Sequence, residues 1–334
     1  MDKFSTRFIT TEKMPLVVEP VKKNIQFNEF LDLISTYNDS LKKNLLKYGA
    51  ILFRNFPVSD ENDFSSVIKG FGAGKFVDYI GGDSPRNKIK DGVYTSTEAP
   101  PSVKIPLHNE LSFVKYHPKH IYFYCHVPPQ SNGETIIADS RKVFNSVDDR
   151  VKKRFMDKGL KYVSCYYYKS NVMQFINNLQ RCHKSWIDVF ETHDKDEVEK
   201  KCREHEFDFK WNQNDWLQIS QTRPAAMHHP SLNEMVWFNQ AHLYDFNPRL
   251  LGLWKYVGAK LFYIRKHMRL HEVYFADGSP IPREDLYHVL DVLDANTIYF
   301  PWQKGDVLIL DNVLAMHGRA TFKGKRRILT AMTD

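Results

Sequence analysis

The fold class is decided by the C-terminal stretch TIYFPWQKGDVLILDNVLAMHGRATFKGKRRILTAMT (297–333), which alternates short apolar runs with turn residues. Runs rich in β-branched and aromatic residues, bounded by Gly, Pro, Asn or Asp, are typical of β-strands. Strands are therefore expected at 297–302, 306–312 and 327–333. Similar runs occur earlier in the chain, at 50–56, 121–127, 134–139, 160–168 and 235–240.

Segments with apolar residues at helical spacing interrupt these strands. One covers 27–48 and is followed by Gly49, a residue type that often ends helices. Further helices are expected after Asp60 and over 248–268. Many short strands with inserted helices predict a mainly β protein of the α+β class, built on a double-stranded β-helix or jelly roll.

The domain organisation is expected to be simple. No internal repeat, low-complexity tract or Gly/Ser linker divides the 334 residues. We expect a single domain over 1–334, with an N-terminal elaboration of helices and strands at about 1–90 and a jelly-roll core at about 91–334. Helical insertions into that core are expected at about 170–206 and 242–296.

The composition excludes several classes of protein. No apolar run approaches the ~20 residues that span a bilayer, and the first residues lack the apolar segment of a secretory signal. Four cysteines form no CxxC pair, which predicts reduced thiols in a cytoplasmic protein. The net charge is +7, but basic residues alternate with acidic ones. Neither nucleic acid nor a membrane is therefore expected as a partner.

The chemistry is concentrated in His108-Asn109-Glu110 and in His317 far downstream. Residues i and i+2 of an extended segment point to the same side, so His108 and Glu110 can reach one ion. Two imidazoles and a carboxylate are the ligand set of non-haem Fe(II) centres with open coordination positions. The same set also occurs at catalytic zinc, so the ligands alone leave both metals open.

An arginine ten residues after His317 favours iron. Arg327 would supply a fixed cation near the metal, and its planar guanidinium matches a carboxylate in a two-pronged contact. A 2-oxoglutarate co-substrate that chelates Fe(II) through one end needs such a cation for its other carboxylate. A zinc hydrolase has no general need for a cation in that position.

On these residues the chain resembles the taurine dioxygenase family of Fe(II)/2-oxoglutarate oxygenases. Within it, the chain resembles the clavaminate-synthase-like branch and the aspartyl β-hydroxylase of the syringomycin pathway. The matching stretches follow in the expected order, namely LLKYGAILFRNFPV (45–58), VYTSTEAPPSVKIPLHNELSF (93–113), NGETIIADSRKVF (132–144), VWFNQAHL (236–243) and WQKGDVLILDNVLAMHGRATFKGKRRIL (302–329).

The resemblance implies Fe(II), 2-oxoglutarate and O2 as cofactor and co-substrates. His108, Glu110 and His317 are implied as iron ligands, Arg327 as the clamp for the far carboxylate of 2-oxoglutarate, and Thr135 as its hydroxyl partner. Taurine dioxygenase itself has aspartate where this chain has Glu110. It also has an arginine for the sulfonate four residues after the clamp, where this chain has Ala331, and this argues against taurine as the substrate.

The implied reaction is hydroxylation of an unactivated C–H bond in a small substrate during natural-product biosynthesis. That substrate would be an amino acid, free or bound to a carrier protein. Arg223, Lys104 and Asn239, together with Gln240 beside it, are the candidate substrate-binding residues. Desaturation or cyclisation at the same centre, a zinc hydrolase and a non-catalytic jelly-roll binding protein stay open as alternatives, and so does the oligomeric state.

Overall fold

The computed structural model describes residues 3–72, 74–77, 88–90, 92–97, 99–168, 185–245, 247–262 and 271–334. Its centre is an eight-stranded sheet in the order β1-β2-β3-β16-β7-β19-β5-β4, in which every neighbouring pair is antiparallel except β2 and β3. The strands are β1 (Phe4–Phe8), β2 (Leu16–Pro20), β3 (Ala50–Phe53), β4 (Lys88–Lys90), β5 (Val93–Thr95), β7 (His120–Val127), β16 (Val307–Asp311) and β19 (Arg327–Thr333).

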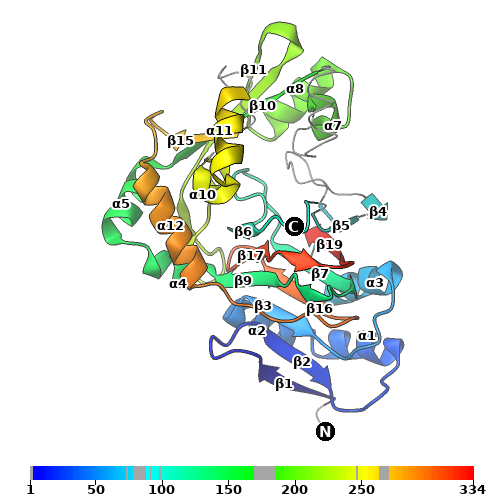
Figure 1. The fold of residues 1–334 in the computed structure, drawn as a ribbon. Coiled ribbons are helices and arrows are strands. Elements are labelled where there is room, and N and C mark those ends of the chain that lie inside the picture. Colours follow the sequence, from blue (N-terminus) through cyan, green and yellow to red (C-terminus); the bar gives the residue numbers. More distant parts are fainter. Residues whose placement is uncertain are drawn as a thin grey trace.

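A three-stranded sheet in the order β6-β17-β9 packs against this large sheet (Figure 1). It consists of β6 (Ile105–His108), β17 (Ala315–Arg319) and β9 (Thr135–Asp139), and the short pair β8 (Ser131–Asn132) and β18 (Phe322–Lys323) lies beside it. One apolar cluster joins the two sheets, because it contains Leu308 and Met332 of the large sheet and Ile137 and Ala315 of the small one. Two sheets that face each other across such a core form the expected jelly roll.

Helices cover the outer face of the large sheet. They are α1 (Phe27–Thr36), α2 (Asn38–Tyr48) and α3 (Glu61–Phe71). The side chains of Phe30 and Phe64 are completely buried there with Phe53 and Tyr124 of the sheet. Asp60 caps α3 by accepting hydrogen bonds from the backbone N–H groups of Asn62 and Asp63.

A third sheet, in the order β11-β12-β10-β15, extends from the small sheet and carries helices of its own (Figure 1). Its strands are β10 (Leu160–Tyr166), β11 (Asp208–Trp211), β12 (Leu217–Arg223) and β15 (His271–Phe275). The helices of this part of the chain are α4 (Ser140–Ser146), α5 (Asp149–Lys158), α7 (Trp186–Phe190), α8 (Lys195–Glu204), the 3-10 turn η1 (Gln213–Asp215), α9 (Ala241–Tyr244), α10 (Pro248–Leu251), α11 (Leu253–Phe262) and α12 (Arg283–Ala295), and a hairpin of β13 (Ala226–His228) and β14 (Met235–Trp237) completes it.

Three expected elements differ in the structure. The expected helix 27–48 is two helices, because Tyr37 has non-helical φ/ψ angles of −104° and 16°. The expected helix 248–268 is broken at Gly252, whose φ of 78° ends α10, and its last residues lie outside the described ranges. Segment 297–302 is not a strand, because only Ile298 forms a bridge to Ile137 and the segment otherwise runs irregularly.

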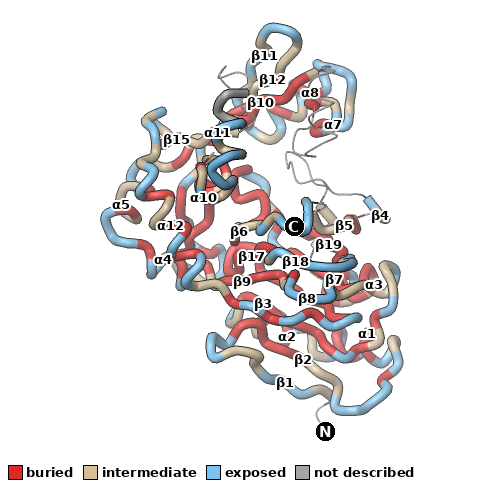
Figure 2. The backbone as a smooth tube through the Cα atoms, in the orientation of Figure 1, coloured by how far each residue is buried: buried red, intermediate tan, exposed pale blue. Residues whose placement is uncertain are grey.

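Burial is greatest where the sheets meet and falls towards the added elements (Figure 2). Residues 170–184 of the expected insertion 170–206 lie outside the described ranges, whereas α7 and α8 occupy the rest of it. No helix within those ranges is both long enough and apolar enough to cross a lipid bilayer.

Candidate active site

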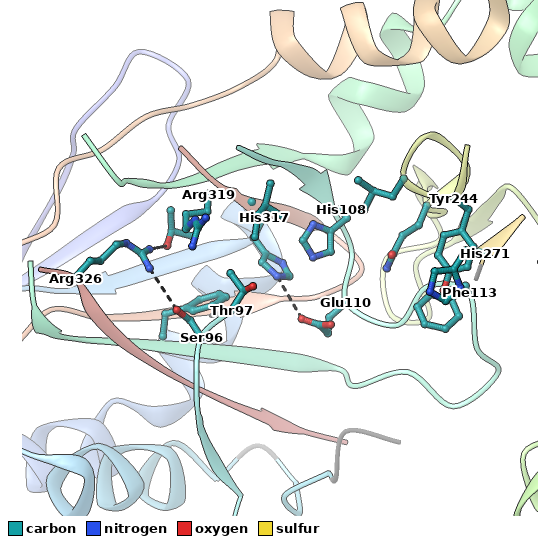
Figure 3. Close-up of a pocket in the computed structure, with 16 residues that line it drawn as sticks. Ser96, Thr97, His108, Glu110, Phe113, Tyr244, His271, His317, Arg319 and Arg326 are labelled. Atoms are coloured by element: carbon teal, nitrogen blue, oxygen red, sulfur yellow. Dashed lines mark hydrogen bonds and ion pairs between the residues drawn. The ribbon is translucent and has the colours of Figure 1, made fainter. Parts of the chain in front are cut away.

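The pairing of β6 with β17 brings the two sequence-predicted histidines together. His108 is the register partner of His317, and their ring centroids lie 4.4 Å apart. Glu110 Oε2 lies 3.5 Å from His317 Nε2, and the ligand atoms of all three residues lie within 4.8 Å of one another (Figure 3). Residues 108, 110 and 317 therefore converge on one point, although 209 positions separate the first from the last.

The spacing in the sequence suggested that Glu110 reaches this point from an extended strand, but the structure shows that it does not. β6 ends at His108, and Glu110 lies in a turn that continues to Leu111, which has a positive φ of 52°. The side chain of Asn312 accepts a hydrogen bond from the Glu110 N–H at 2.8 Å and donates one to its C=O at 2.9 Å. Glu110 is thus held by a buried amide and not by a β-ladder.

The two imidazoles are suited to metal binding. His108 Nδ1 lies 2.9 Å from the Pro106 carbonyl oxygen, which can only accept, so Nδ1 carries the proton and Nε2 is left as the ligand atom. Burial, and then the nearby His317 imidazole, lower the pKa of His108 to about 3, so the ring is neutral at physiological pH. His317 Nδ1 is buried without a hydrogen-bond partner among the described residues. Two imidazoles and a carboxylate in this arrangement fit a divalent ion of the Fe(II) type.

The three side chains lie in the middle of a cavity of about 250 Å³. Polar and basic side chains gather at one end and aromatic ones at the other (Figure 3). The lining residues are Ser96, Thr97, Ile105, His108, Glu110, Phe113, Phe123, Thr135, Gln240, Leu243, Tyr244, His271, His317, Gly318, Arg319 and Arg326.

The basic end is built around Arg326. Its guanidinium donates hydrogen bonds to the Gly133 carbonyl at 2.9 Å, to Ser96 Oγ at 3.3 Å and to Thr135 Oγ1 at 3.4 Å. Thr135 also accepts a hydrogen bond from Trp302 Nε1 at 3.3 Å. Burial, and then the Arg319 guanidinium, lower the pKa of Arg326 to about 10, so it keeps its charge at neutral pH.

Arg327, the expected clamp, is not an arginine of this cavity, which is lined instead by its neighbour Arg326. Arg327 is the exposed first residue of β19 and does not line the cavity. The register of β19 against β7 shifts between Arg327 and Ile328, because Arg327 is opposite Val127 and Ile328 is opposite Cys125. The shift adds a residue to β7, and the side chains of β19 still alternate: Ile328 and Met332 pack between the sheets, whereas Leu329 and Ala331 pack towards the helices. Arg326 therefore lies on the inner side and Arg327 on the outer side.

Three of the four candidate substrate residues, Arg223, Lys104 and Asn239, do not line the cavity. The Arg223 guanidinium donates to Gln221 Oε1 at 3.2 and 3.1 Å, and Lys104 pairs with Asp294 at 2.7 Å on the wall of a second cavity. Asn239 is completely buried and bonds the backbone of Ala225 and Ala241. All three are occupied by structural contacts, whereas Gln240, the neighbour of Asn239, does line the cavity.

The aromatic end was missed by reasoning from the sequence. It is formed by Phe113, which follows the HNE motif closely, and by Tyr244 and His271 from distant segments. The Tyr244 ring lies 5.2 Å from Phe113 and 4.8 Å from His271, measured between ring centroids. Proximity to the motif could have pointed to Phe113, but no local pattern marks the other two.

This fold and this group of side chains are those of an Fe(II)- and 2-oxoglutarate-dependent dioxygenase. Residues 10–333 match the protein family described as taurine catabolism dioxygenase TauD, TfdA family, and the chain belongs to that family. Because the chain belongs to this enzyme family, the alternative interpretations as a zinc hydrolase and as a non-catalytic binding protein are excluded. Membership of the family also confirms Fe(II) as the cofactor and 2-oxoglutarate and O2 as the co-substrates.

Two relatives match over most of their length. The chain is 34% identical over 290 residues to the dapdiamide synthesis protein DdaC of Enterobacter agglomerans, which covers 87% of this chain and 83% of that protein. It is 29% identical over 331 residues to a clavaminate synthase-like protein of Arabidopsis thaliana, which covers 96% of this chain and 94% of that protein.

Solved structures share the fold at low sequence identity. AAD-2 in complex with Mn(II) and N-oxalylglycine has a TM-score of 0.55 at 12% identity, over 99% of this chain and 97% of that one. A taurine dioxygenase from Burkholderia xenovorans has a TM-score of 0.54 at 11% identity, over 100% of this chain and 90% of that one. The jelly-roll architecture expected from the sequence is therefore confirmed.

Proposed function

We propose that this dioxygenase hydroxylates an unactivated C–H bond of a small substrate, an amino acid or a close derivative, in natural-product biosynthesis. The similarity to a dapdiamide synthesis protein supports the biosynthetic role. The observation that carries the proposal is the layout of the cavity, in which the His2Glu group separates a basic end from an aromatic end. Each end is suited to one of two small molecules that must meet at the metal.

We assign His108, Glu110 and His317 as the iron ligands. When bound there, Fe(II) with 2-oxoglutarate and O2 supplies the oxidising chemistry. The protein has to orient the substrate and the co-substrate relative to each other and to exclude bulk water from the site. Glu110 and His317 are only 3% and 5% exposed, which favours that exclusion.

The basic end is assigned to 2-oxoglutarate. Arg326, with Thr135 and Ser96 beside it, offers a charged guanidinium and two hydroxyl groups to the carboxylate remote from the metal. Charge-assisted hydrogen bonds of this kind are stronger than neutral ones, and the arginine fork favours a planar carboxylate. Arg326 thereby takes the role that the sequence suggested for Arg327.

The aromatic end is assigned to the substrate. Phe113 and Tyr244 offer apolar ring faces. The ring of Tyr162 packs against that of Tyr244, with 5.0 Å between the two ring centroids. His271 Nδ1 lies 2.9 Å from Ser164 Oγ, a contact that fixes the plane of its imidazole. Gln240 also lines the cavity, and its Nε2 donates a hydrogen bond to the Asn109 carbonyl at 2.6 Å. This combination suits a compact molecule with an apolar body and a few hydrogen-bonding groups.

The first experiment tests the co-substrate site. Anaerobic addition of Fe(II) and 2-oxoglutarate is expected to produce a visible charge-transfer band in the purified protein, and Glu110→Ala is expected to weaken or remove it. A folded protein that gives no band with both additions would contradict the ligand assignment.

The second experiment identifies the substrate. Amino acids and carrier-bound aminoacyl groups are screened for substrate-dependent release of succinate, and products are weighed by mass spectrometry. Hydroxylation adds one oxygen atom to the substrate, whereas desaturation removes two hydrogen atoms. Succinate release with none of the amino acids or aminoacyl groups would exclude the substrate class, and loss of two hydrogen atoms would replace hydroxylation by desaturation.

A further inference from the structure

Asn312 does not line the cavity, but its side chain forms hydrogen bonds with the backbone of Glu110, one of the proposed metal ligands. It follows β16 directly, precedes His317 by five positions and is completely buried. Its side-chain oxygen accepts the Glu110 N–H at 2.8 Å. Its side-chain nitrogen donates to the carbonyls of Glu110 at 2.9 Å and Pro118 at 2.8 Å. The amide thus uses both of its N–H donors and its acceptor.

These contacts replace a missing stretch of β-sheet. β6 ends at His108, so the peptide groups of Glu110 lie beyond the last ladder pair between β6 and β17. A buried peptide group without a partner costs about 1–3 kcal/mol. The Asn312 side chain meets both the N–H and the C=O of Glu110, as the backbone of a neighbouring strand would.

The backbone of Asn312 is itself immobilised. Its N–H donates to the Lys119 carbonyl at 2.8 Å, and its C=O accepts from Asn109 Nδ2 at 2.6 Å. One oxygen of the preceding Asp311 accepts the backbone N–H groups of Val313 and Leu314, at 2.9 and 3.0 Å. The turn that leads from β16 into β17 therefore has little freedom to shift the Asn312 amide.

The other Asp311 oxygen is also engaged, because it lies 3.1 Å from His229 Nε2. The same turn leads directly to Ala315, the first residue of the strand that carries His317. The turn between β16 and β17 thus holds Glu110 through the side chain of Asn312, and its backbone leads into the strand that carries His317, the third proposed ligand.

We propose that Asn312 is a positioning residue that sets the Glu110 carboxylate relative to the two imidazoles. The inference rests on the proposed ligand set. The direct β6–β17 pairing aligns the histidines with each other and ends before Glu110, whose peptide groups are held instead by the Asn312 side chain. Partners that orient metal ligands from outside the coordination sphere contribute strongly to metal affinity.

The test compares Asn312→Ala with a matched variant, Asn247→Ala. Asn247 is also a completely buried asparagine with two hydrogen bonds to backbone groups, but it caps α10 and does not line the cavity. Fe(II) affinity is measured anaerobically, and the visible spectrum of the Co(II)-substituted protein reports which ligands bind. Glu110→Ala is measured in parallel as the reference for loss of the carboxylate.

Asn312→Ala is expected to weaken Fe(II) binding about 10- to 100-fold and to shift the Co(II) spectrum towards that of Glu110→Ala. Asn247→Ala is expected to lower the melting temperature while it keeps the affinity and spectrum of the unaltered protein. If Asn312→Ala does not yield folded protein, Asn312→Ser replaces it in the same comparison, because serine retains one hydrogen-bonding group.

Three outcomes would overturn the inference. The first is a normal Fe(II) affinity and Co(II) spectrum in Asn312→Ala while Glu110→Ala loses both. The second is an equal loss of affinity in Asn247→Ala, and the third is failure of both Asn312 variants to fold while Asn247→Ala folds. A Glu110→Ala protein that binds Fe(II) normally would contradict the ligand assignment itself and would be distinguishable from all three.

Discussion

Neighbouring residues can have opposite roles here, and the pair Arg326–Arg327 is the clearest case. Both carry the same side chain, but Arg326 is half-buried among oxygen acceptors at the end of the cavity and Arg327 is exposed. The difference arises from the alternation of side chains along β19, in which Ile328 faces the core between the sheets and Leu329 faces the helices. Because a strand places successive side chains on opposite faces, Arg326 lies on the inner face with Ile328, and Arg327 lies on the outer face.

Replacement of each arginine in turn tests this assignment. Arg326→Ala is expected to raise the KM for 2-oxoglutarate about 10- to 100-fold, because a hydrogen-bonded charged contact contributes about 1.5–3 kcal/mol. Arg327→Ala is the control and is expected to leave KM close to that of the unaltered enzyme. Steady-state succinate release at varied 2-oxoglutarate measures both, and a larger effect from Arg327→Ala would restore the position expected from the sequence.

A second prediction at this scale concerns His242. This histidine is completely buried, and its Nε2 lies 2.9 Å from the Leu107 carbonyl, next to the first proposed ligand. Burial lowers its pKa from 6.5 to about 4. The unfolded chain therefore binds a proton between these values that the folded protein does not, and the free energy of unfolding falls as the pH decreases from about 6.5 to about 4.

The slope attributable to one such histidine approaches about 1.4 kcal/mol per pH unit. Chemical denaturation of the metal-free protein at a series of pH values measures it, and His242→Gln is expected to flatten the curve while it retains a donor for Leu107. An unchanged slope in His242→Gln would show that this residue does not contribute to the acid sensitivity.

At the scale of elements, the β6–β17 pair determines the geometry of the site. Gly318 lies between the paired His317 and Arg319, where the two strands approach closely. A Cβ atom at position 318 would lie 2.4 Å from the Ile105 carbonyl oxygen and 2.9 Å from that of Pro106. Both contacts are with backbone, so the strands would have to separate to admit even a methyl group.

Gly318→Ala is therefore expected to displace β6 and to impair Fe(II) binding and turnover together, since His108 is carried by the strand that moves. Gly258→Ala serves as the control, because a Cβ atom there meets nothing within 4 Å and the residue lies in α11. Alanine in a helix is favoured over glycine by about 0.5–1 kcal/mol, so this variant is expected to keep full activity. Normal Fe(II) affinity in Gly318→Ala would show that the two strands tolerate the methyl group.

At the scale of the whole molecule, distant parts of the chain share one sheet. The large sheet contains strands that begin at Phe4 and end at Thr333. The Arg54 guanidinium forms a two-pronged pair with Asp306 at 3.0 and 2.7 Å, and both side chains are almost completely buried. We propose on these grounds that the chain is a single folding domain and that the first ~90 residues belong to it.

Arg54→Ala tests this coupling of the two chain ends. Removal of one partner from a buried ion pair is expected to lower the free energy of unfolding by about 3–5 kcal/mol. Arg7→Ala breaks a largely exposed pair with Glu19 and is expected to cost about 0–1 kcal/mol. Denaturant titration followed by fluorescence and by circular dichroism measures both, and two separate transitions in the unaltered protein would contradict a single domain.

Local patterns in the sequence were sufficient for much of this description. The alternation of short apolar runs and turn residues indicated the strands of the jelly roll. The Asp60 cap and the Gly49 terminus marked helix ends that the structure contains. The His-x-Glu spacing and the late histidine identified three side chains that the fold brings within reach of one ion. Each of these signals depends on neighbours in the chain, which is why one sequence was enough.

Only the tertiary structure decided the rest. The ion pair of Lys104 with Asp294, the burial of Asn239 and the convergence of Phe113, Tyr244 and His271 on the cavity all depend on partners outside the local sequence. The same holds for Asn312, because its side-chain amide is hydrogen-bonded to Glu110, about 200 positions earlier in the chain. Side-chain direction and long-range hydrogen bonding follow from how complete sheets pack, and no local spacing encodes that.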